Sequence, residues 1–422
     1  MIYRAAVIAA VIVVAGVAWI SLPPVAPAEE EAPPEPLSGI QSGVFYCVGS
    51  GAGAETAFQA VSGSASTSLS SIIDSNMVVD TVEITTERPA TAMFKPPGQL
   101  FTGGAVVEVE AVEAGASWIN EGPTRTTATT CYAEPRNAWT IYGGPIGSAD
   151  RLVLRLMNPL LSSAKADIRL TTEFGPEPIT ELESVGVPPR DVVEIPLHEI
   201  LGQRTMVKVA VDVTDGRLLP AMVSTTPNGI ATWRAERAAT DWYLPTVRVG
   251  DVVGDIAVTN PRQEHVEVEY TGIDSSGVSG QETLVLEPLG HVVLPATSLG
   301  PVVLGSRISA TGPVIVTLVG DSESGRYGES AISDLSRRWM VAGPSRGGAI
   351  DIWILNPSPT EANVTVGEGP SARTIQIRSG TSAHITVESP EGSLVASDQP
   401  VAVSWSTQGR LALSNASPLE LE

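Results

Sequence analysis

Apolar and polar positions alternate in short runs over most of the chain beyond its first 42 residues. Residues 166–170, 266–270 and 363–366 place an apolar side chain at every second position. Alternation with this period buries one face of a strand and leaves the other in water, which is typical of an antiparallel sheet. No helical periodicity extends over ten or more residues after Leu22. The pattern therefore predicts an all-β protein beyond the amino-terminal segment.

A longer pattern occurs three times: a tryptophan, a loop that contains glycine, and an alternating strand that ends in Asn-Pro. The Trp-to-Asn separations are 19, 18 and 17 residues, and successive copies begin 103 and 97 residues apart. Proline lacks the N–H that a sheet requires, so Asn-Pro is expected to end the strand, with the Asn side chain bonded to nearby backbone. The repeat-defining residues are Trp139, Asn158 and Pro159; Trp242, Asn260 and Pro261; and Trp339, Asn356 and Pro357.

We interpret the recurring tryptophan as a core residue, and a stacking platform for sugars is the alternative. Each copy also contains two apolar runs around turn-forming residues, which predict a β-hairpin. These hairpins are expected at residues 207–223, 307–319 and 394–405, with turns at 214–216, 311–313 and 397–400. A weaker copy is expected at residues 106–119, turning near Ala114-Gly115.

Six or seven strands in 80–100 residues predict tandem immunoglobulin-like β-sandwich repeats. A β-propeller is the alternative fold, in which each unit would supply two four-stranded blades. Because blade repeats are usually about 40–50 residues long, the period near 100 favours sandwiches. The expected β units are residues 43–138, which lack Asn-Pro and form a divergent copy, and residues 139–241, 242–338 and 339–422.

The amino terminus predicts export from the cytoplasm. Residues 5–22 carry no charge and follow Arg4, and 18 helical residues span about 27 Å, enough for a bilayer core. Residues 1–22 are therefore a transmembrane signal anchor or a signal peptide, and Ala26-Pro27-Ala28 offers a cleavage site. Residues 23–42 are rich in Pro and Glu and predict an extended stalk. The expected location is the cell membrane, single-pass with the bulk extracytoplasmic, or secreted after cleavage.

The charge of the chain argues against one class of partner, and its cysteines predict a covalent cross-link. The chain has 422 residues with 47 acidic and 25 basic ones, a net charge of −22, which argues against binding nucleic acid. Cys47 and Cys131 are the two cysteines, and an even pair in an exported chain predicts a disulfide. Closing a loop of about 85 residues would contribute roughly 4–5 kcal/mol in the chain-entropy account.

Motifs that carry chemistry are not convincing in this sequence. Residues 320–325 resemble the nucleophile segment of chymotrypsin-like proteases only superficially, because the following glycines are missing. The four histidines lie far apart in the sequence, and no pair has the spacing of metal ligands. We therefore expect no catalytic residue, metal or cofactor, and a protein that is not an enzyme.

Behind a signal anchor and a Pro/Glu stalk, the tandem Trp…Asn-Pro pattern resembles a secreted, membrane-anchored all-β family of unknown function from high-GC Gram-positive bacteria. The 22 Arg against three Lys fit such a genome. The resemblance covers about residues 43–422 and implies an envelope protein without an assigned activity. The expected function is a binding or scaffolding module in the cell envelope, with an envelope protein or glycan as partner. The alternative is a glycan-binding or glycan-processing accessory of the envelope.

Overall fold

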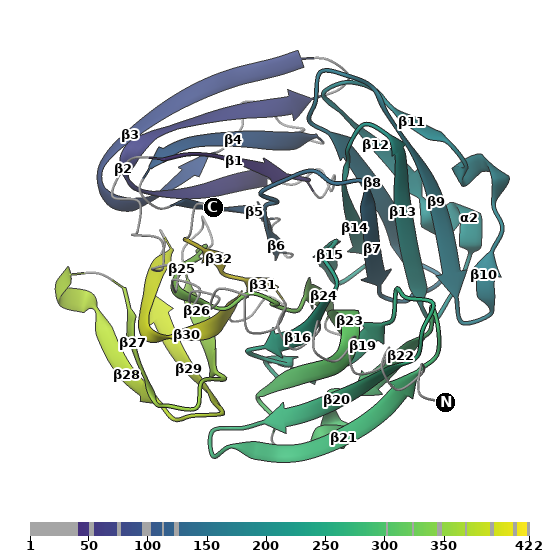
Figure 1. Cartoon of the computed structure of the whole chain (residues 1–422). Helices are drawn as coiled ribbons and strands as arrows, with labels where there is room; N and C mark the ends of the chain where they lie inside the picture. The colour runs from purple at the N-terminus through teal and green to yellow at the C-terminus, as the bar shows by residue number, and fades with distance from the viewer. Residues whose placement is uncertain are drawn as a thin grey trace, which may run out of the picture. The chain divides into compact units, whose positions relative to one another are not determined.

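The structure is a computed structural model (Figure 1). It describes residues 41–49, 55–73, 77–94, 103–111, 114–121, 126–300, 303–322, 325–343, 348–367, 369–388, 392–407 and 412–419. The predicted signal anchor, and the stalk up to residue 40, lie outside the described residues. Within the described residues, no helix has the length and apolar character needed to cross a membrane.

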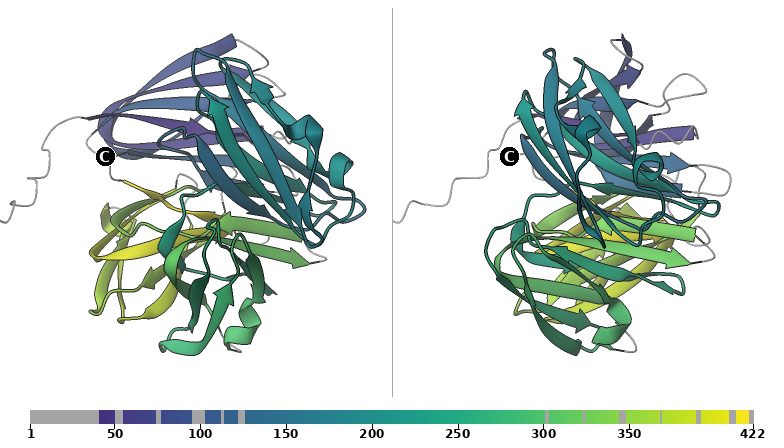
Figure 2. Two further views of the ribbon diagram at one scale, coloured as in Figure 1. Left: turned by 45° about the vertical axis from the view of Figure 1, so that its right-hand side comes forward. Right: turned by 90° about the vertical axis from the view of Figure 1, so that its right-hand side faces the viewer.

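Strands dominate the described residues in every view, which confirms the predicted all-β class (Figure 1; Figure 2). They fall into four strand groups that follow one another along the chain. The first group holds β1 (Gln41–Cys47), β2 (Glu55–Ile73), β3 (Met77–Phe94), β4 (Gly104–Ala111), β5 (Ala114–Glu121) and β6 (Thr126–Thr130). The second holds β7 (Ala138–Gly143), β8 (Arg151–Asn158), β9 (Ala164–Thr172), β10 (Gly175–Glu177), η1 (Thr180–Leu182), β11 (Val185–Val187), β12 (Asp191–Pro196), α2 (Leu197–Leu201), β13 (Val207–Asp215), β14 (Leu219–Thr225) and β15 (Ile230–Arg234).

The third group holds β16 (Ala239–Leu244), β17 (Arg248–Val249), β18 (Val252–Val253), β19 (Asp255–Thr259), β20 (Val266–Ile273), β21 (Val278–Leu286), β22 (His291–Pro295), η2 (Ala296–Leu299), β23 (Gly305–Ser322) and β24 (Gly325–Ser330). The fourth holds β25 (Ser336–Val341), β26 (Ala349–Asn356), β27 (Ala362–Val366), η3 (Gly369–Ser371), β28 (Arg373–Ile377), β29 (Thr381–Glu388), β30 (Ser393–Thr407), β31 (Leu413–Asn415) and β32 (Ser417–Pro418).

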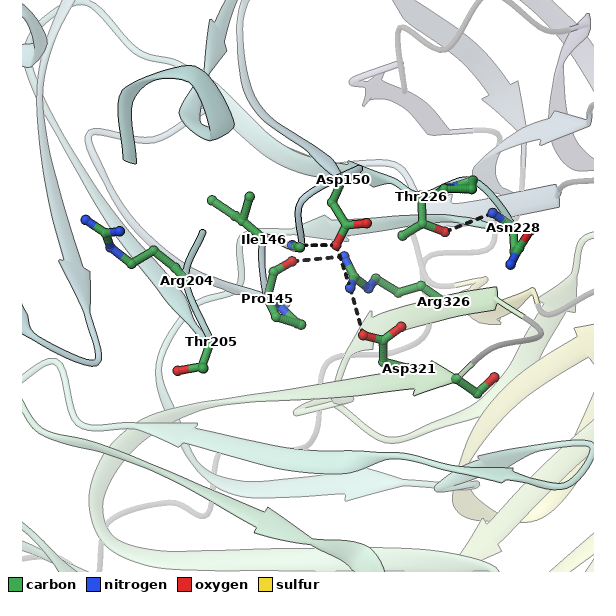
Figure 3. Close-up of a pocket in the computed structure, with 12 residues that line it drawn as sticks. Pro145, Ile146, Asp150, Arg204, Thr205, Thr226, Asn228, Asp321 and Arg326 are labelled. Carbon is green, nitrogen blue, oxygen red and sulfur yellow. Dashed lines mark hydrogen bonds and ion pairs between the residues drawn. The ribbon is translucent and has the colours of Figure 1, made fainter. Parts of the chain in front are cut away.

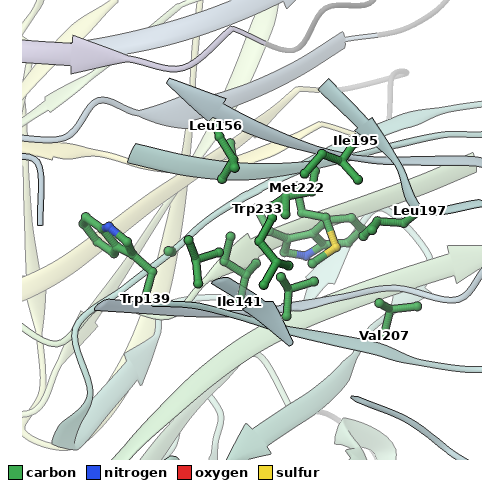
Figure 4. Close-up of a cluster of buried hydrophobic side chains, with 14 of the residues drawn as sticks. Trp139, Ile141, Leu156, Ile195, Leu197, Val207, Met222 and Trp233 are labelled. Atoms are coloured by element: carbon green, nitrogen blue, oxygen red, sulfur yellow. The ribbon is translucent and has the colours of Figure 1, made fainter. Parts of the chain in front are cut away.

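Groups two to four repeat one pairing scheme with two antiparallel sheets. In the third group the strand orders are β21-β20-β23-β16 and β22-β19-β23-β24. The corresponding orders are β10-β9-β13-β7 with β12-β8-β14-β15 in the second group, and β28-β27-β30-β25 with β29-β26-β30-β31 in the fourth. Side chains from both sheets of a group meet in one core, as Trp139, Leu156 and Met222 do in the second (Figure 4). Apolar burial between paired sheets therefore holds each group together.

The predicted hairpins are wrong. The residues expected to turn lie inside one strand in β23 and β30, and β13 and β14 pair with other strands instead of with each other. The first half of β23 pairs with β20 and the second half with β19, so the strand passes from one sheet to the other. Near this crossing Ala239 pairs with Val314 and Asp241 with Ser309, which leaves the segment around Pro313 outside the ladder. A residue without an N–H is tolerated at such a place.

The first group follows the same scheme with fewer, longer strands. The expected hairpin at residues 106–119 is also wrong, because β4 and β5 pair with different parts of β2. Residues 67–72 of β2 occupy the place of β20, and residues 55–62 that of β19. These two places are separate strands in the other groups, where Asn-Pro follows the first of them. The absence of Asn-Pro in the first group thus coincides with an unbroken strand of 19 residues.

One strand from each group takes part in a cycle of contacts that joins the four groups: β6, β15, β24 and β31. β6 contacts β15, β15 contacts β24, β24 contacts β31, and β31 contacts β6. Next to this closing contact, β32 contacts β5: Ser417 Oγ lies 3.0 Å from Ser117 Oγ and donates to Ala116 O. Residues 412–419 at the carboxyl end therefore pack against strands from the start of the described chain.

Candidate functional site

The three repeat-defining tryptophans are buried in equivalent surroundings. Trp139 Nε1 donates to Leu218 O (2.8 Å), Trp242 Nε1 to Val314 O (2.9 Å) and Trp339 Nε1 to Val401 O (3.1 Å). Each acceptor directly precedes the residues with which the chain enters the other sheet of its group, which are β14 in the second group and the second halves of β23 and β30 in the third and fourth. All three rings are at most 6% exposed, so they serve the core and are not available as a sugar platform.

The three asparagines make one recurring set of hydrogen bonds and are fully buried. Each Oδ1 accepts from the backbone N–H two residues later, which is an Asx-type turn. Each Nδ2 donates to the carbonyl four residues later. It also donates to a carbonyl shortly before β12, β22 or β29, the strand that pairs with the strand before the asparagine. These acceptors are Ser162 and Val187 for Asn158, Glu264 and Glu287 for Asn260, and Thr360 and Ile377 for Asn356. Pro159, Pro261 and Pro357 follow directly, so the motif is a structural clamp between two connections.

The two cysteines form a disulfide between the end of β1 and the residue after β6, with their Cα atoms 4.5 Å apart. Next to it Tyr46 and Tyr132 exchange backbone hydrogen bonds of 2.7 and 2.8 Å. The bond joins the first and last strands of the first group. None of the nine repeat-defining residues and two cysteines is among the residues that line the cavity described next.

The candidate site is a cavity of about 550 Å³ between the second and third groups (Figure 3). Four parts of the chain form it: the connection from β7 to β8, the residues before β13, the turn from β14 to β15, and the end of β23 together with Arg326 of β24. Its polar lining includes Asp150, Arg204, Thr205, Thr226, Asn228, Asp321, Ser322 and Arg326.

Arg326 lies between the two carboxylates of the cavity and is only 3% exposed (Figure 3). Its Nη2 donates to Asp150 Oδ2 (3.0 Å) and to Asp321 Oδ2 (2.7 Å). Its Nη1 donates to Pro145 O (2.9 Å) and Ser224 Oγ (2.7 Å). Because Asp150, Pro145 and Ser224 belong to the second group, this one guanidinium ties the third group to the second.

The remaining lining groups suit a polar, neutral ligand. Asp150 Oδ2 also accepts from Gly147 N (2.7 Å), and Arg204 pairs with Glu177 (3.1 Å), so both charges have partners within the protein. Hydroxyl and amide groups in the lining can donate to and accept from a ligand, and Ile146 and Pro227 add apolar surface. Within the described part of the chain, no group of three or more His, Cys, Asp or Glu residues could hold a metal ion.

This cavity could not be predicted from the sequence, because its charged residues come from distant segments. Asp150 and Arg326 are 176 residues apart. Asp321 and Ser322 belong to residues 320–325, whose resemblance to a protease segment is only superficial. They are the last two residues of β23 and line the cavity.

A second buried polar cluster lies where the four groups meet. Glu329 on β24 is 1% exposed and accepts from Ser330 N (2.9 Å) and Asn415 N (3.1 Å). Burial raises the pKa of Glu329 to about 8, although the guanidinium of Arg234 opposes the rise. The cluster connects β24 to β31 and is closed to solvent, so we assign it to the assembly of the groups and not to a ligand site.

Comparisons with known proteins support only a family assignment. The model of a family of unknown function matches residues 102–388. A search of curated proteins gave no match. Among solved structures, the chain matches a tetra-tandem repeat in the extending region of a large adhesion protein. The identity is 12%, the match covers 90% of this chain and 99% of that one, and the TM-score is 0.11, a value too low to support an argument.

Proposed function

Because the chain belongs to the Family of unknown function (DUF5719), which brings no activity with it, we propose a function from the protein's own features: a non-enzymatic binding or scaffolding module of the cell envelope. The observation that carries the proposal is the cavity built around Arg326. This hollow has both apolar and polar walls, and its charged groups are paired within the protein. Its position at a seam fixed by a buried guanidinium favours holding a ligand.

The closed cycle of contacts between the strand groups would hold the walls of that cavity in fixed positions. Trp233 of the second group donates to Leu318 O of the third (3.1 Å), and Ser382 of the fourth donates to Pro245 O (2.7 Å). Binding loses less conformational entropy when the site is pre-organised in this way. Each group would then be an immunoglobulin-like sandwich, with ligands bound at the seams.

The placement in the envelope depends on the sequence. Residues 5–22 would cross the membrane once, residues 23–42 would extend from it, and the strand groups would lie outside the cytoplasm. Cleavage after Ala28 would instead release the protein. An envelope protein or glycan is the proposed partner, and the net charge of −22 disfavours nucleic acid.

A second candidate is a glycan-binding or glycan-processing accessory, favoured by the two carboxylates in one cavity. Asp150 and Asp321 share one guanidinium, however, and this pairing suits orientation of a ligand better than proton transfer. The proposal therefore places binding first.

The test is co-sedimentation of the full-length protein with isolated envelope glycan and with detergent-solubilised envelope proteins. We expect retention on one fraction, and its loss in the double variant Thr226→Ala, Asn228→Ala, whose side chains line the cavity. Gln263→Ala, an exposed amide away from the cavity, is the matched control. No retention on any fraction would contradict the proposal, whereas release of new reducing ends from the glycan would favour the second candidate.

A further inference from the structure

Three arginines surround a second cavity, of about 370 Å³, in the second strand group. Arg136 comes from the connection between β6 and β7, Arg217 from that between β13 and β14, and Arg237 from that between β15 and β16. The lining is completed by Glu134, Pro135, Asn137 and Ala138. Three positive side chains thus meet at one place in a chain whose net charge is −22.

The lining contains one negative charge against these three positive ones. Glu134 accepts from Arg136 Nε (2.7 Å), and the Arg136 guanidinium carbon lies 5.8 Å from the centroid of the Trp139 ring. Arg136 is therefore held in place from two sides. For Arg217 and Arg237 the described residues provide no carboxylate within ion-pair distance. Like charges gathered without counter-charges destabilise a site, and a bound anion relieves this repulsion.

The other strand groups show that the arginines are not needed by the fold. Equivalent positions in the other groups can be found from the repeat-defining Trp. Arg136 lies three residues before that Trp, and Arg217 lies one residue before the residue whose carbonyl accepts from the Trp indole. Arg237 follows the residue that pairs with the residue directly after that Trp. The equivalents of Arg136, Arg217 and Arg237 are Ala239, Pro313 and Ser333 in the third group, and Ser336, Pro400 and Pro418 in the fourth. All six are neutral, so the second group alone of these three has the positive cluster.

We propose that this arginine pocket binds a single phosphate group, carried by a small or otherwise neutral ligand. Guanidinium groups form paired N–H···O bonds with oxyanions, and three of them from three connections match three phosphate oxygens better than the two of a carboxylate. The net negative charge of the protein repels long polyanions. At physiological salt, charges more than about 8 Å away are screened, so a single phosphate group in the pocket is affected mainly by the three arginines. The proposal does not depend on the cavity around Arg326.

The experiment is a calorimetric titration of the full-length protein with inorganic phosphate at constant ionic strength. We expect saturable binding that weakens by about tenfold or more in the double variant Arg217→Gln, Arg237→Gln, because two charge-assisted contacts are lost. The control double variant Arg151→Gln, Arg337→Gln removes the same charge from exposed positions elsewhere and should change the affinity less than about twofold. Since Arg217 and Arg237 are exposed, circular dichroism should show unchanged folding.

Titrations with other ligands show whether the phosphate can be free or esterified, and whether three oxygens are needed for binding. A phosphate monoester should bind about as tightly as inorganic phosphate, and acetate more weakly. The proposal is overturned if the wild-type protein shows no saturable phosphate binding, if both double variants bind equally, or if acetate binds as tightly as phosphate. Tighter binding of long-chain polyphosphate would overturn the assignment to a single group. Thr226→Ala, Asn228→Ala should leave phosphate binding unchanged, which separates this test from that of the proposed function.

Discussion

At the scale of single residues, the asparagine of the repeat holds two connections in place. Its side chain replaces backbone hydrogen bonds at a point where proline has removed one donor. The bonds of Asn158, Asn260 and Asn356 agree in partners and in spacing, although the loops they join differ in sequence. The motif was visible in the sequence because Asn, Pro and the first two hydrogen-bond partners lie within five positions, whereas the second carbonyl acceptor of each Asn is 21 to 29 residues away and was not predicted.

Asn356→Ala should lower the free energy of unfolding by about 1–3 kcal/mol, because the buried carbonyl of Ile377 and the part-buried carbonyl of Thr360 lose their donor. Urea denaturation monitored by tryptophan fluorescence measures the change. Asn137→Ala removes an exposed amide and serves as the control. Equal unfolding midpoints for Asn356→Ala and the wild type would show that the clamp does not contribute to stability.

At the scale of strands, the sequence predicted where the chain changes direction but not how. Turn-forming residues such as Gly312-Pro313 are found both in hairpins and where a strand leaves one sheet for another. Which of the two occurs depends on the strands that lie alongside, and β16, β19 and β20 come from far away in the chain. The cavity around Arg326 could not be predicted for the same reason, since three-dimensional pairing creates it.

Contact between strands of neighbouring groups also requires a small residue at one position. A Cβ added to Gly328 on β24 would lie 2.1 Å from Nε1 of Trp233 on β15, and that indole is fully buried. Gly328→Ala should therefore displace the indole and destabilise the protein by about 1–3 kcal/mol. A lower thermal midpoint and a changed near-ultraviolet dichroism spectrum would show this. Gly186→Ala, where a Cβ meets nothing within 4 Å, should leave both unchanged.

At the scale of the whole described chain, the four strand groups share one buried polar centre, and its ionisation links assembly to pH. The carboxyl of Glu329 has a pKa near 8 in the folded protein against 4.5 in its unperturbed state. Between these values the folded protein holds a proton that the unfolded chain releases. The stability contributed by this group is therefore complete below pH 4.5 and is lost as the pH rises toward 8.

Glu329→Gln should remove this pH dependence. In the wild type, we expect the group to lower the free energy of unfolding between pH 5 and 8 by at most about 1.4 kcal/mol per pH unit. Urea denaturation at several pH values, compared between the variant and the wild type, isolates this slope from that of the other acids. Glu267→Gln, an exposed carboxyl on β20, should keep the wild-type slope. Identical slopes in all three proteins would contradict the raised pKa.

The contact of Ser417 with Ala116 and Ser117 has a consequence for the order in which the protein matures. A chain is made from its amino terminus, so β5 and β6 exist long before the residues that will cover them. Until residues 412–419 have been synthesised, the sheet of the first group keeps an uncovered flank, open to premature association or to a chaperone. Nascent chains halted before residue 412 should thus be the aggregation-prone stage of biogenesis.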